Sequence, residues 1–116
     1  MLFDPTYFRD LTPARATAVF PADWPLFAGH FPGRPVVPAY VLIGLVLAHA
    51  EHALGSSLEL HGVDRMKLSD GVEPDELVTS ELEPPTPQGD LVTVRSRLSS
   101  AGSEVGTFTI SARVGA

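Results

Sequence analysis

His30 is the residue whose surroundings best suit acid–base chemistry. It stands between Gly29 and a Phe-Pro-Gly turn (31–33), in a loop that runs into a predicted helix start at Pro38. The first amides of a helix have no intrahelical acceptor, and with the helix dipole they stabilise an oxygen that gains negative charge. A histidine base beside such a site is the minimum needed to remove a proton next to a carbonyl. Taken alone, His30 is more simply explained as a solvated or structurally hydrogen-bonded side chain.

The sequence around this histidine carries a specific motif. Residues 29–38 read GHFPGRPVVP and resemble the GHFPGxPxxPG signature of the β-hydroxyacyl-acyl-carrier-protein dehydratases of the FabA/FabZ type. Residues 20–23 (FPAD), 63–68 and 72–82 resemble the flanking strands of that family. The resemblance covers about residues 17–114 and is closest to the ApeI-like dehydratases of aryl-polyene clusters.

The resemblance implies a role for several residues. His30 matches the catalytic histidine, which takes the C2 proton and then handles the water that leaves from C3. The Val36 carbonyl matches the group that orients this histidine, and the Ala39 N–H matches the donor that holds the thioester oxygen. The remaining positions assigned to substrate binding are Phe31, Gly33 and Tyr40.

The resemblance also implies the fold, substrate and partners. The family has the hotdog fold and is dimeric, with an acyl tunnel between the subunits. The implied reaction is dehydration of a 3-hydroxyacyl thioester to the trans-2-enoyl thioester, in fatty-acid or polyene-type biosynthesis. The substrate is carried by acyl carrier protein or CoA, and no cofactor or metal is expected. We expect a homodimer or higher homo-oligomer, or a heterodimer with a second hotdog protein.

The sequence departs from the family pattern at two places. The family has an Asp or Glu on the helix six residues after the last proline of the motif, where this chain has Gly44. The nearest helix acid, Glu51, lies about 10 Å further along by helical rise. The family's usual Gly and small aliphatic residue are replaced by Ala39 and Tyr40. Tyr40 either narrows the tunnel or packs in the core with its hydroxyl hydrogen-bonded.

Loss of a general acid costs about 10²–10⁴ in rate, so three explanations stay open. A water beside Gly44 passes the proton, a different subunit supplies the carboxylate, or the chain only binds acyl groups or pairs with an active homologue. Retention of His30 favours the first two explanations. A hotdog acyl thioesterase is a further alternative, against which the missing carboxylate counts.

Composition limits these functions further. The 116 residues make one domain, 1–116, and they are 44% hydrophobic with 11 prolines and no cysteine. A net charge of −6 argues against nucleic-acid binding, and the absence of cysteine fits a cytoplasmic protein. No signal peptide is evident at residues 1–5. The uncharged run at 39–48 is too short for a membrane span and predicts a buried helix.

The elements that position the motif are predicted from periodicity and turn residues. Residues 1–15 are expected to be irregular and 21–38 a rigid extended loop, because five prolines exclude helix and inner strand. A helix is predicted at 39–54, starting after Pro38 and ending at Gly55, with its first ten residues surrounded by protein. The predicted strands are 16–20, 58–68, 77–83, 91–99 and 105–114, the last four as an antiparallel meander. The predicted class is α+β, a hotdog sheet wrapped around one buried helix.

The remaining polar residues have plainer interpretations. His49, Glu51 and His52 are interpreted as a polar face at the solvent end of the helix rather than a metal site, and His61 has no evident partners. The acidic residues between 70 and 83 are expected to form a solvated edge that discourages strand pairing and cannot receive an acidic carrier. If a carrier protein delivers the substrate, its landing patch should come from basic residues, namely Arg34, Arg65, Lys67, Arg95 and Arg97.

Overall fold

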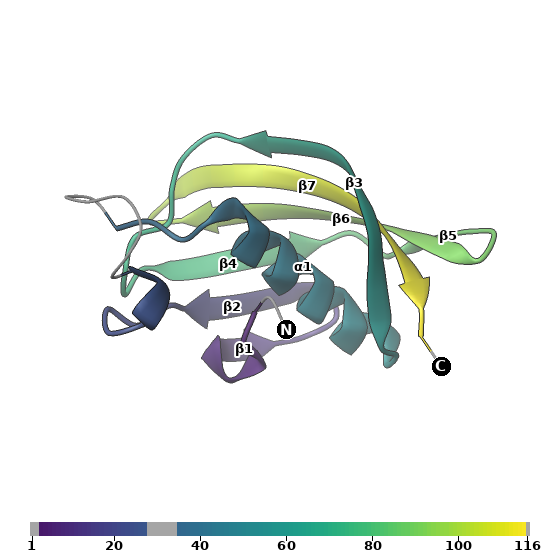
Figure 1. Cartoon of the computed structure of the whole chain (residues 1–116), viewed down its shortest axis with the longest axis horizontal. Helices are drawn as coiled ribbons and strands as arrows, with labels where there is room; N and C mark the ends of the chain where they lie inside the picture. The colour runs from purple at the N-terminus through teal and green to yellow at the C-terminus, as the bar shows by residue number, and fades with distance from the viewer. Residues whose placement is uncertain (1–2, 28–34, 116) are drawn as a thin grey trace.

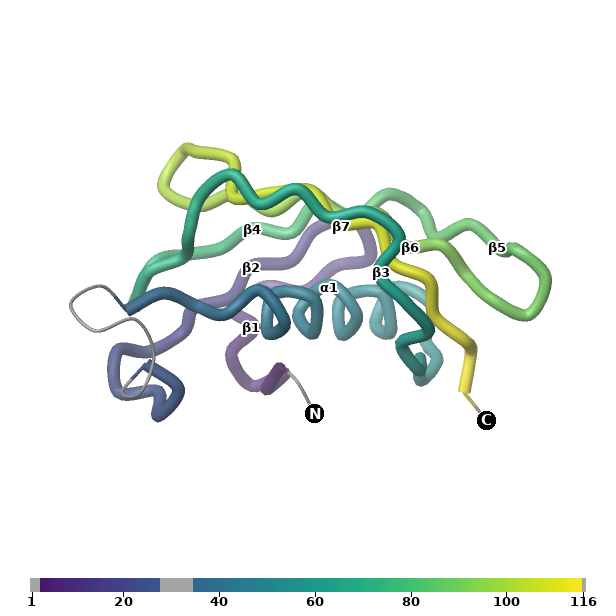
Figure 2. The backbone as a smooth tube through the Cα atoms, turned by 45° about the horizontal axis from the view of Figure 1, so that its top comes forward, coloured from purple at the N-terminus to yellow at the C-terminus, as the bar shows by residue number. Residues whose placement is uncertain are grey.

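The computed structural model describes residues 3–27 and 35–115. Within these residues seven strands form one antiparallel sheet that curves around one α-helix, as Figure 1 shows. The helix runs lengthwise beneath the concave face of the sheet (Figure 2). The elements are η1 (Pro5–Tyr7), β1 (Phe8–Leu11), β2 (Arg15–Val19), η2 (Pro25–Phe27), α1 (Ala39–Leu54), β3 (Leu58–Leu68), β4 (Leu77–Leu82), β5 (Thr86–Gln88), β6 (Leu91–Ser100) and β7 (Ser103–Val114).

The strand order corrects the predicted meander. The strands lie in the order β1-β2-β4-β6-β7-β3, and β5 pairs with β6 outside this path. β3 therefore pairs with β7 rather than with β4, which follows it in sequence. β3 has 11 residues and β7 has 12, so the two long strands match, while the loop after β3 carries the chain to the middle of the sheet. β3 becomes one edge of the sheet and β1 the other.

Three segments contain structure that periodicity did not predict. Residues 1–15 are not irregular throughout, because η1 is followed by β1, which pairs with β2. The proline-rich segment is not wholly extended, since it includes η2, which starts at Pro25. β5 forms between the predicted strands 77–83 and 91–99 by pairing with β6. All four elements have only three or four residues, too few to show a period.

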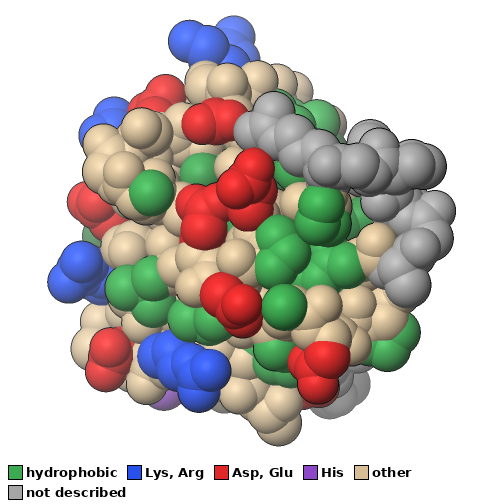
Figure 3. Space-filling view, turned by 90° about the vertical axis from the view of Figure 1, so that its left-hand side faces the viewer, with side chains coloured by type: hydrophobic (Ala, Val, Ile, Leu, Met, Phe, Trp, Pro, Cys, Tyr) green, Lys and Arg blue, Asp and Glu red, His purple; other side chains and the backbone are tan. Residues whose placement is uncertain are grey.

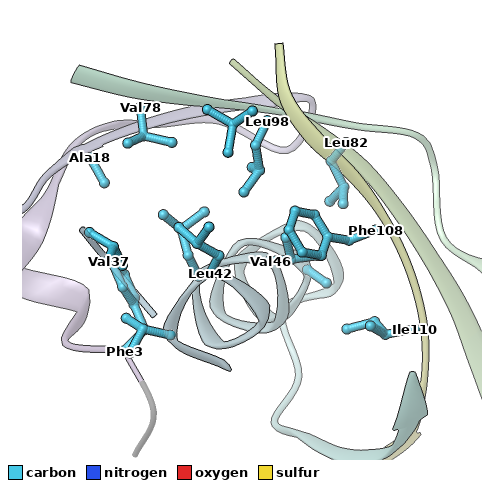
Figure 4. Close-up of a cluster of buried hydrophobic side chains, with 14 of the residues drawn as sticks. Phe3, Ala18, Val37, Leu42, Val46, Val78, Leu82, Leu98, Phe108 and Ile110 are labelled. Carbon is cyan, nitrogen blue, oxygen red and sulfur yellow. The ribbon is translucent and has the colours of Figure 1, made fainter. Parts of the chain in front are cut away.

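The core lies between the helix and the concave face of the sheet. The inner face of β6 contributes Val92, Val94, Ser96 and Leu98, which are all buried. Phe108, Ile110 and Ala112 of β7 are fully buried. Figure 4 shows Leu42 and Val46 of α1 pointing toward Val78, Leu98 and Phe108 of the sheet. Full burial of each large aliphatic side chain stabilises the fold by about 1.5–3 kcal/mol.

The helix begins and ends where predicted, but its first ten residues are not surrounded by protein on every side. Pro38 caps its start, and Gly55 ends it in the left-handed region at φ 65°. Tyr40 in its first turn is 45% exposed, and Ile43 and Leu47 are only half-buried. Within the residues that the structure describes, the front of α1 is therefore covered on one side only. No helix in the described part of the chain is long and apolar enough to cross a membrane.

His49 contradicts the predicted polar face because its side chain is fully buried. Its Nε2 lies 2.8 Å from the Thr12 carbonyl oxygen, and its Nδ1 lies 2.8 Å from Ser80 Oγ. A carbonyl can only accept, so Nε2–H donates to Thr12, and Nδ1 accepts from the Ser80 hydroxyl. Ser96 Oγ lies 2.7 Å from Ser80 Oγ and completes the network. The network joins α1 to β4, β6 and the β1–β2 turn.

Gly106 allows the close approach of β7 and β3. A Cβ atom at this position would overlap the Lys67 carbonyl oxygen. We expect Gly106→Ala to lower the free energy of unfolding by about 1–3 kcal/mol, because the backbone of β3 must shift. Gly62→Ala is the matched control in the same strand pair, since a Cβ there meets nothing within 4 Å. Urea denaturation of both variants checks the expectation, and equal losses would contradict it.

His49 predicts a stability that depends on pH. Burial lowers the pKa of His49, with a smaller contribution in the same direction from His52, so the folded chain binds this proton less readily than the unfolded chain. The free energy of unfolding is therefore greatest above the unfolded-state pKa of about 6.5. It falls as the pH drops below this value, by up to about 1.4 kcal/mol per pH unit. Denaturant titrations from pH 8 to pH 5 measure this slope.

His49→Gln preserves a donor and an acceptor without a titrating ring, so its slope should be shallower. His52→Gln alters an exposed histidine one turn on and should change the slope less than His49→Gln does, because His52 makes only the smaller contribution to the lowered pKa of His49. Equal slopes in wild type and His49→Gln would show that another group governs the acid transition.

Candidate active site at the start of the helix

The segment before the helix is held in place by the loop after β3. Val37 N donates to the Val72 carbonyl at 2.8 Å, and both side chains are buried. Gly71 packs on the side chain of Val36, where an added Cβ would lie 3.1 Å from Val36 Cγ1. The path of the chain into α1 is therefore determined by two residues that follow β3.

The first amides of α1 face no acceptor within the described residues. Pro38 has extended backbone (φ −60°, ψ 146°) and contributes no side-chain cap. Its carbonyl accepts from Val41 N at 3.0 Å and from Leu42 N at 3.4 Å, which leaves the N–H groups of Ala39 and Tyr40 without a partner there. These amides and the helix dipole can stabilise an oxygen that gains negative charge.

The structure brings together only part of the predicted site. Val36, Ala39 and Tyr40 lie at the helix start, with Val36 and Ala39 half-buried and Tyr40 exposed. His30, Phe31 and Gly33 belong to residues 28–34, which lie outside the described residues. The roles assigned to these residues stay predictions.

The position of the family's acid is buried and lies one helical turn after Tyr40. Gly44 fills it and is enclosed in the core. Glu51, the only acid in α1, cannot serve instead because its Oε2 accepts from Leu58 N at 2.8 Å and anchors the start of β3. Near the helix start, Asp75 accepts from Ala22 N and Asp70 from Gly71 N. Both carboxylates therefore accept hydrogen bonds from the backbone of loop residues.

An aromatic cluster supports the chain that leads into the motif. Trp24 lies 5.1 Å from Phe27 and 5.2 Å from Phe20, measured between ring centroids. Phe3 and Tyr7 join the cluster through edge contacts with Phe20 at 5.7 and 5.8 Å. Sequence reasoning missed this cluster, although seven of the chain's nine aromatic residues fall within residues 3–31.

The surface around the helix start is acidic and apolar. Figure 3 views the end of the molecule from which α1 begins, and hydrophobic and acidic side chains intermingle there. In the part of the chain that the structure describes, no group of three His, Cys, Asp or Glu side chains could hold a metal ion. His61 is exposed on β3.

Comparisons with known proteins agree on the architecture. The dehydratase heterocomplex ApeI:P from Xenorhabdus doucetiae matches with a TM-score of 0.71 at 17% identity, covering 91% of this chain and 93% of that chain. A putative thioesterase from Novosphingobium aromaticivorans gives 0.72 at 17% identity over 94% of this chain and 41% of that chain. A hypothetical thioesterase with coenzyme A from Streptococcus pneumoniae gives 0.65 at 13% identity over 93% and 84%. No curated protein matches the sequence.

These structural matches confirm the predicted fold, an α+β hotdog with an antiparallel sheet around one helix. The family model described as ApeI dehydratase, ApeI-like, matches residues 9–103. This range includes the strand before the motif, the whole helix and most of the sheet. The chain belongs to the ApeI-like dehydratase family.

Proposed function

We propose that this protein dehydrates a 3-hydroxyacyl thioester to the trans-2-enoyl thioester and water. The C2–H bond breaks as His30 takes the proton, the C2=C3 double bond forms, and the C3–O bond breaks. The departing hydroxyl takes up a proton and leaves as water, so no oxidant, reductant or cofactor is consumed. The family match carries this proposal, because it spans both the motif and the helix that follows it.

The helix start suits the oxygen of the thioester. Removal of the C2 proton moves negative charge onto that oxygen, and the Ala39 amide has no acceptor among the described residues. We assign Ala39 N–H as its donor, the Val36 carbonyl as the group that orients His30, and Tyr40, Phe31 and Gly33 as substrate contacts. The loop after β3 supports this assignment because it holds residues 36 and 37 in place.

The missing acid is best supplied by a second hotdog subunit. Glu51 is engaged at the start of β3, so it cannot replace the carboxylate absent at Gly44. Among the described residues β3 pairs only with β7, and its exposed apolar side chains are Val63, Met66 and Leu68. A second subunit would cover this edge, and the ApeI:P match is to a heterocomplex. We propose that the partner brings a helix carboxylate across the interface to His30.

Thioester hydrolysis is the second candidate function. Two structural neighbours are named as thioesterases, one with coenzyme A. The absence of a carboxylate at Gly44 counts against this reaction, since glycine at that position cannot activate water. Free thiol release from an acyl-CoA distinguishes hydrolysis from dehydration, which leaves the thioester intact.

Restoring the helix acid tests the dehydratase directly. We expect Gly44→Glu to raise the rate of enoyl formation from a 3-hydroxyacyl carrier substrate by about 10²–10⁴, the usual contribution of a positioned acid or base. Gly44→Asp is the smaller alternative, because position 44 is buried and circular dichroism must show that each variant folds. Ala48→Glu places the same charge one turn further on and should give no gain.

The gain should vanish when His30→Ala is added to Gly44→Glu. If folded Gly44→Glu and Gly44→Asp proteins form no enoyl product, and the wild type with an acid-bearing partner forms none either, the chain is not a dehydratase. Thiol release by the same samples would then favour the thioesterase.

Pairing with an acid-bearing subunit is testable by co-expression. We expect native mass spectrometry to show a mixed dimer between this chain and a hotdog protein that has a helix carboxylate, and turnover to require both. Met66→Lys should weaken the dimer because it buries a charge at the β3 edge. Val114→Lys, at an equally exposed site on β7, is the control. A homodimer with full turnover would contradict the need for a partner's acid.

A further inference from the structure

Asp75 has a backbone conformation that aspartate adopts less readily than glycine. It is the third residue of a tight turn over residues 73–76, in which Glu76 N donates to the Glu73 carbonyl at 3.4 Å. Pro74 precedes it, and its φ of 65° lies in the left-handed region that glycine and asparagine supply at this position of proline-containing turns. Glycine would form this turn with less strain, so the turn itself gives no reason for an aspartate side chain.

Both polar groups of Asp75 bind the chain that leads into the motif. Its N–H donates to the Phe20 carbonyl at 2.8 Å, and its Oδ1 accepts from Ala22 N at 3.1 Å. Phe20 directly follows β2, and its side chain is fully buried. A backbone bond and a side-chain bond from one residue therefore fix both the place and the direction in which the chain leaves β2.

The same loop, residues 69–76 between β3 and β4, also holds the chain where it enters the helix. Val37 N donates to the Val72 carbonyl at 2.8 Å. The β3–β4 loop therefore binds the chain on both sides of the stretch that contains His30 in the sequence, at Ala22 before it and at Val37 after it. Figure 1 shows this loop, the end of β2 and the start of α1 at the same end of the molecule.

The β3–β4 loop is itself tied to the sheet at both of its ends. At its start, Ser69 N and Asp70 N donate to the Val105 carbonyl of β7 at 2.7 and 3.1 Å. At its end, Glu76 Oε2 accepts from Ser100 Oγ of β6 at 2.9 Å. Because both ends are held by central strands, the loop can transmit the position of the sheet to the two chain segments that it binds.

We infer that Asp75 is a positioning residue that aligns the stretch bearing His30 with the Ala39 amide at the helix start. It acts through the backbone of Phe20 and Ala22 and is not assigned a contact with the substrate. The base and the donor to the thioester oxygen must act on the same molecule, so a shift of about 1 Å in either can cost about 10²-fold in rate. This assignment rests on the proposed function for the reaction that the alignment serves.

Removal of the carboxylate without disturbing the turn tests this role. Asp75→Gly suits the φ of 65° and keeps the N–H that binds Phe20, so it should fold. With a 3-hydroxyacyl-CoA substrate and the acid-bearing subunit, we expect Asp75→Gly to lower kcat for enoyl formation about tenfold or more and to change KM less than about twofold.

Two further variants separate alignment from charge and from strain. Asp75→Asn keeps a side-chain oxygen for Ala22 N but removes the charge, and asparagine tolerates a positive φ, so kcat should return to within about threefold of wild type. Ala101→Gly is the matched control, because Ala101, with φ 52°, is the other non-glycine residue of positive φ in the described chain and lies in the turn between β6 and β7. It should leave kcat unchanged.

A second readout does not depend on turnover. The chain has four histidines, and NMR spectra of histidine-labelled protein report each ring, with His30 assigned by its loss in His30→Gln. We expect Asp75→Gly to move the ring resonances of His30 and to leave those of His52 and His61 in place. Asp75→Asn and Ala101→Gly should leave the His30 resonances close to their wild-type positions.

Three results would overturn the role of Asp75. They are unchanged His30 resonances in folded Asp75→Gly, equal loss of kcat in the glycine and asparagine variants, or wild-type kcat in Asp75→Gly. If the wild type with its partner forms no enoyl product, the proposed reaction is contradicted. The NMR comparison would then decide by itself whether Asp75 positions His30.

Discussion

Burial of an apolar helix in the concave face of one curved sheet is the constraint on which the rest of this structure depends. Val41, Leu42, Leu45 and Val46 are fully or almost fully buried. A flat sheet would leave one side of such a helix in water, so the strands have to curve around it. Because side chains alternate along a pleated strand, the curved sheet has an inner apolar face and an outer polar face. These two faces serve different purposes.

The inner face positions the start of the helix. Because α1 is fixed along its length, its first amides point out of the core at one end, where the Val37–Val72 hydrogen bond sets the path of the incoming chain. His49 is the polar part of the same packing, since its ring joins the helix to Ser80 and Thr12. Charged side chains on the outer face cost little free energy because they stay in water. The register of the strands sets the spacing of the cationic side chains there.

The chain belongs to a dehydratase family but has Gly44 at the helix position where a carboxylate is expected. Tyr40 in the first turn of α1 is exposed, and among the described residues β3 is an edge strand with exposed Val63, Met66 and Leu68. The second subunit proposed above would cover this apolar surface and supply the acid together.

Local signals in the sequence determined the helix limits, the strands β3, β6 and β7, the motif around His30 and the loss of the acid at Gly44. These depend on neighbours in sequence: a proline before the first turn, a glycine after the last, and alternation along a strand. Only the tertiary structure decided that β1 forms, that β3 pairs with β7, and that His49 is buried. Each of these depends on contacts between segments far apart in the chain, and pairing and register across a sheet are selected by the packing of the whole fold.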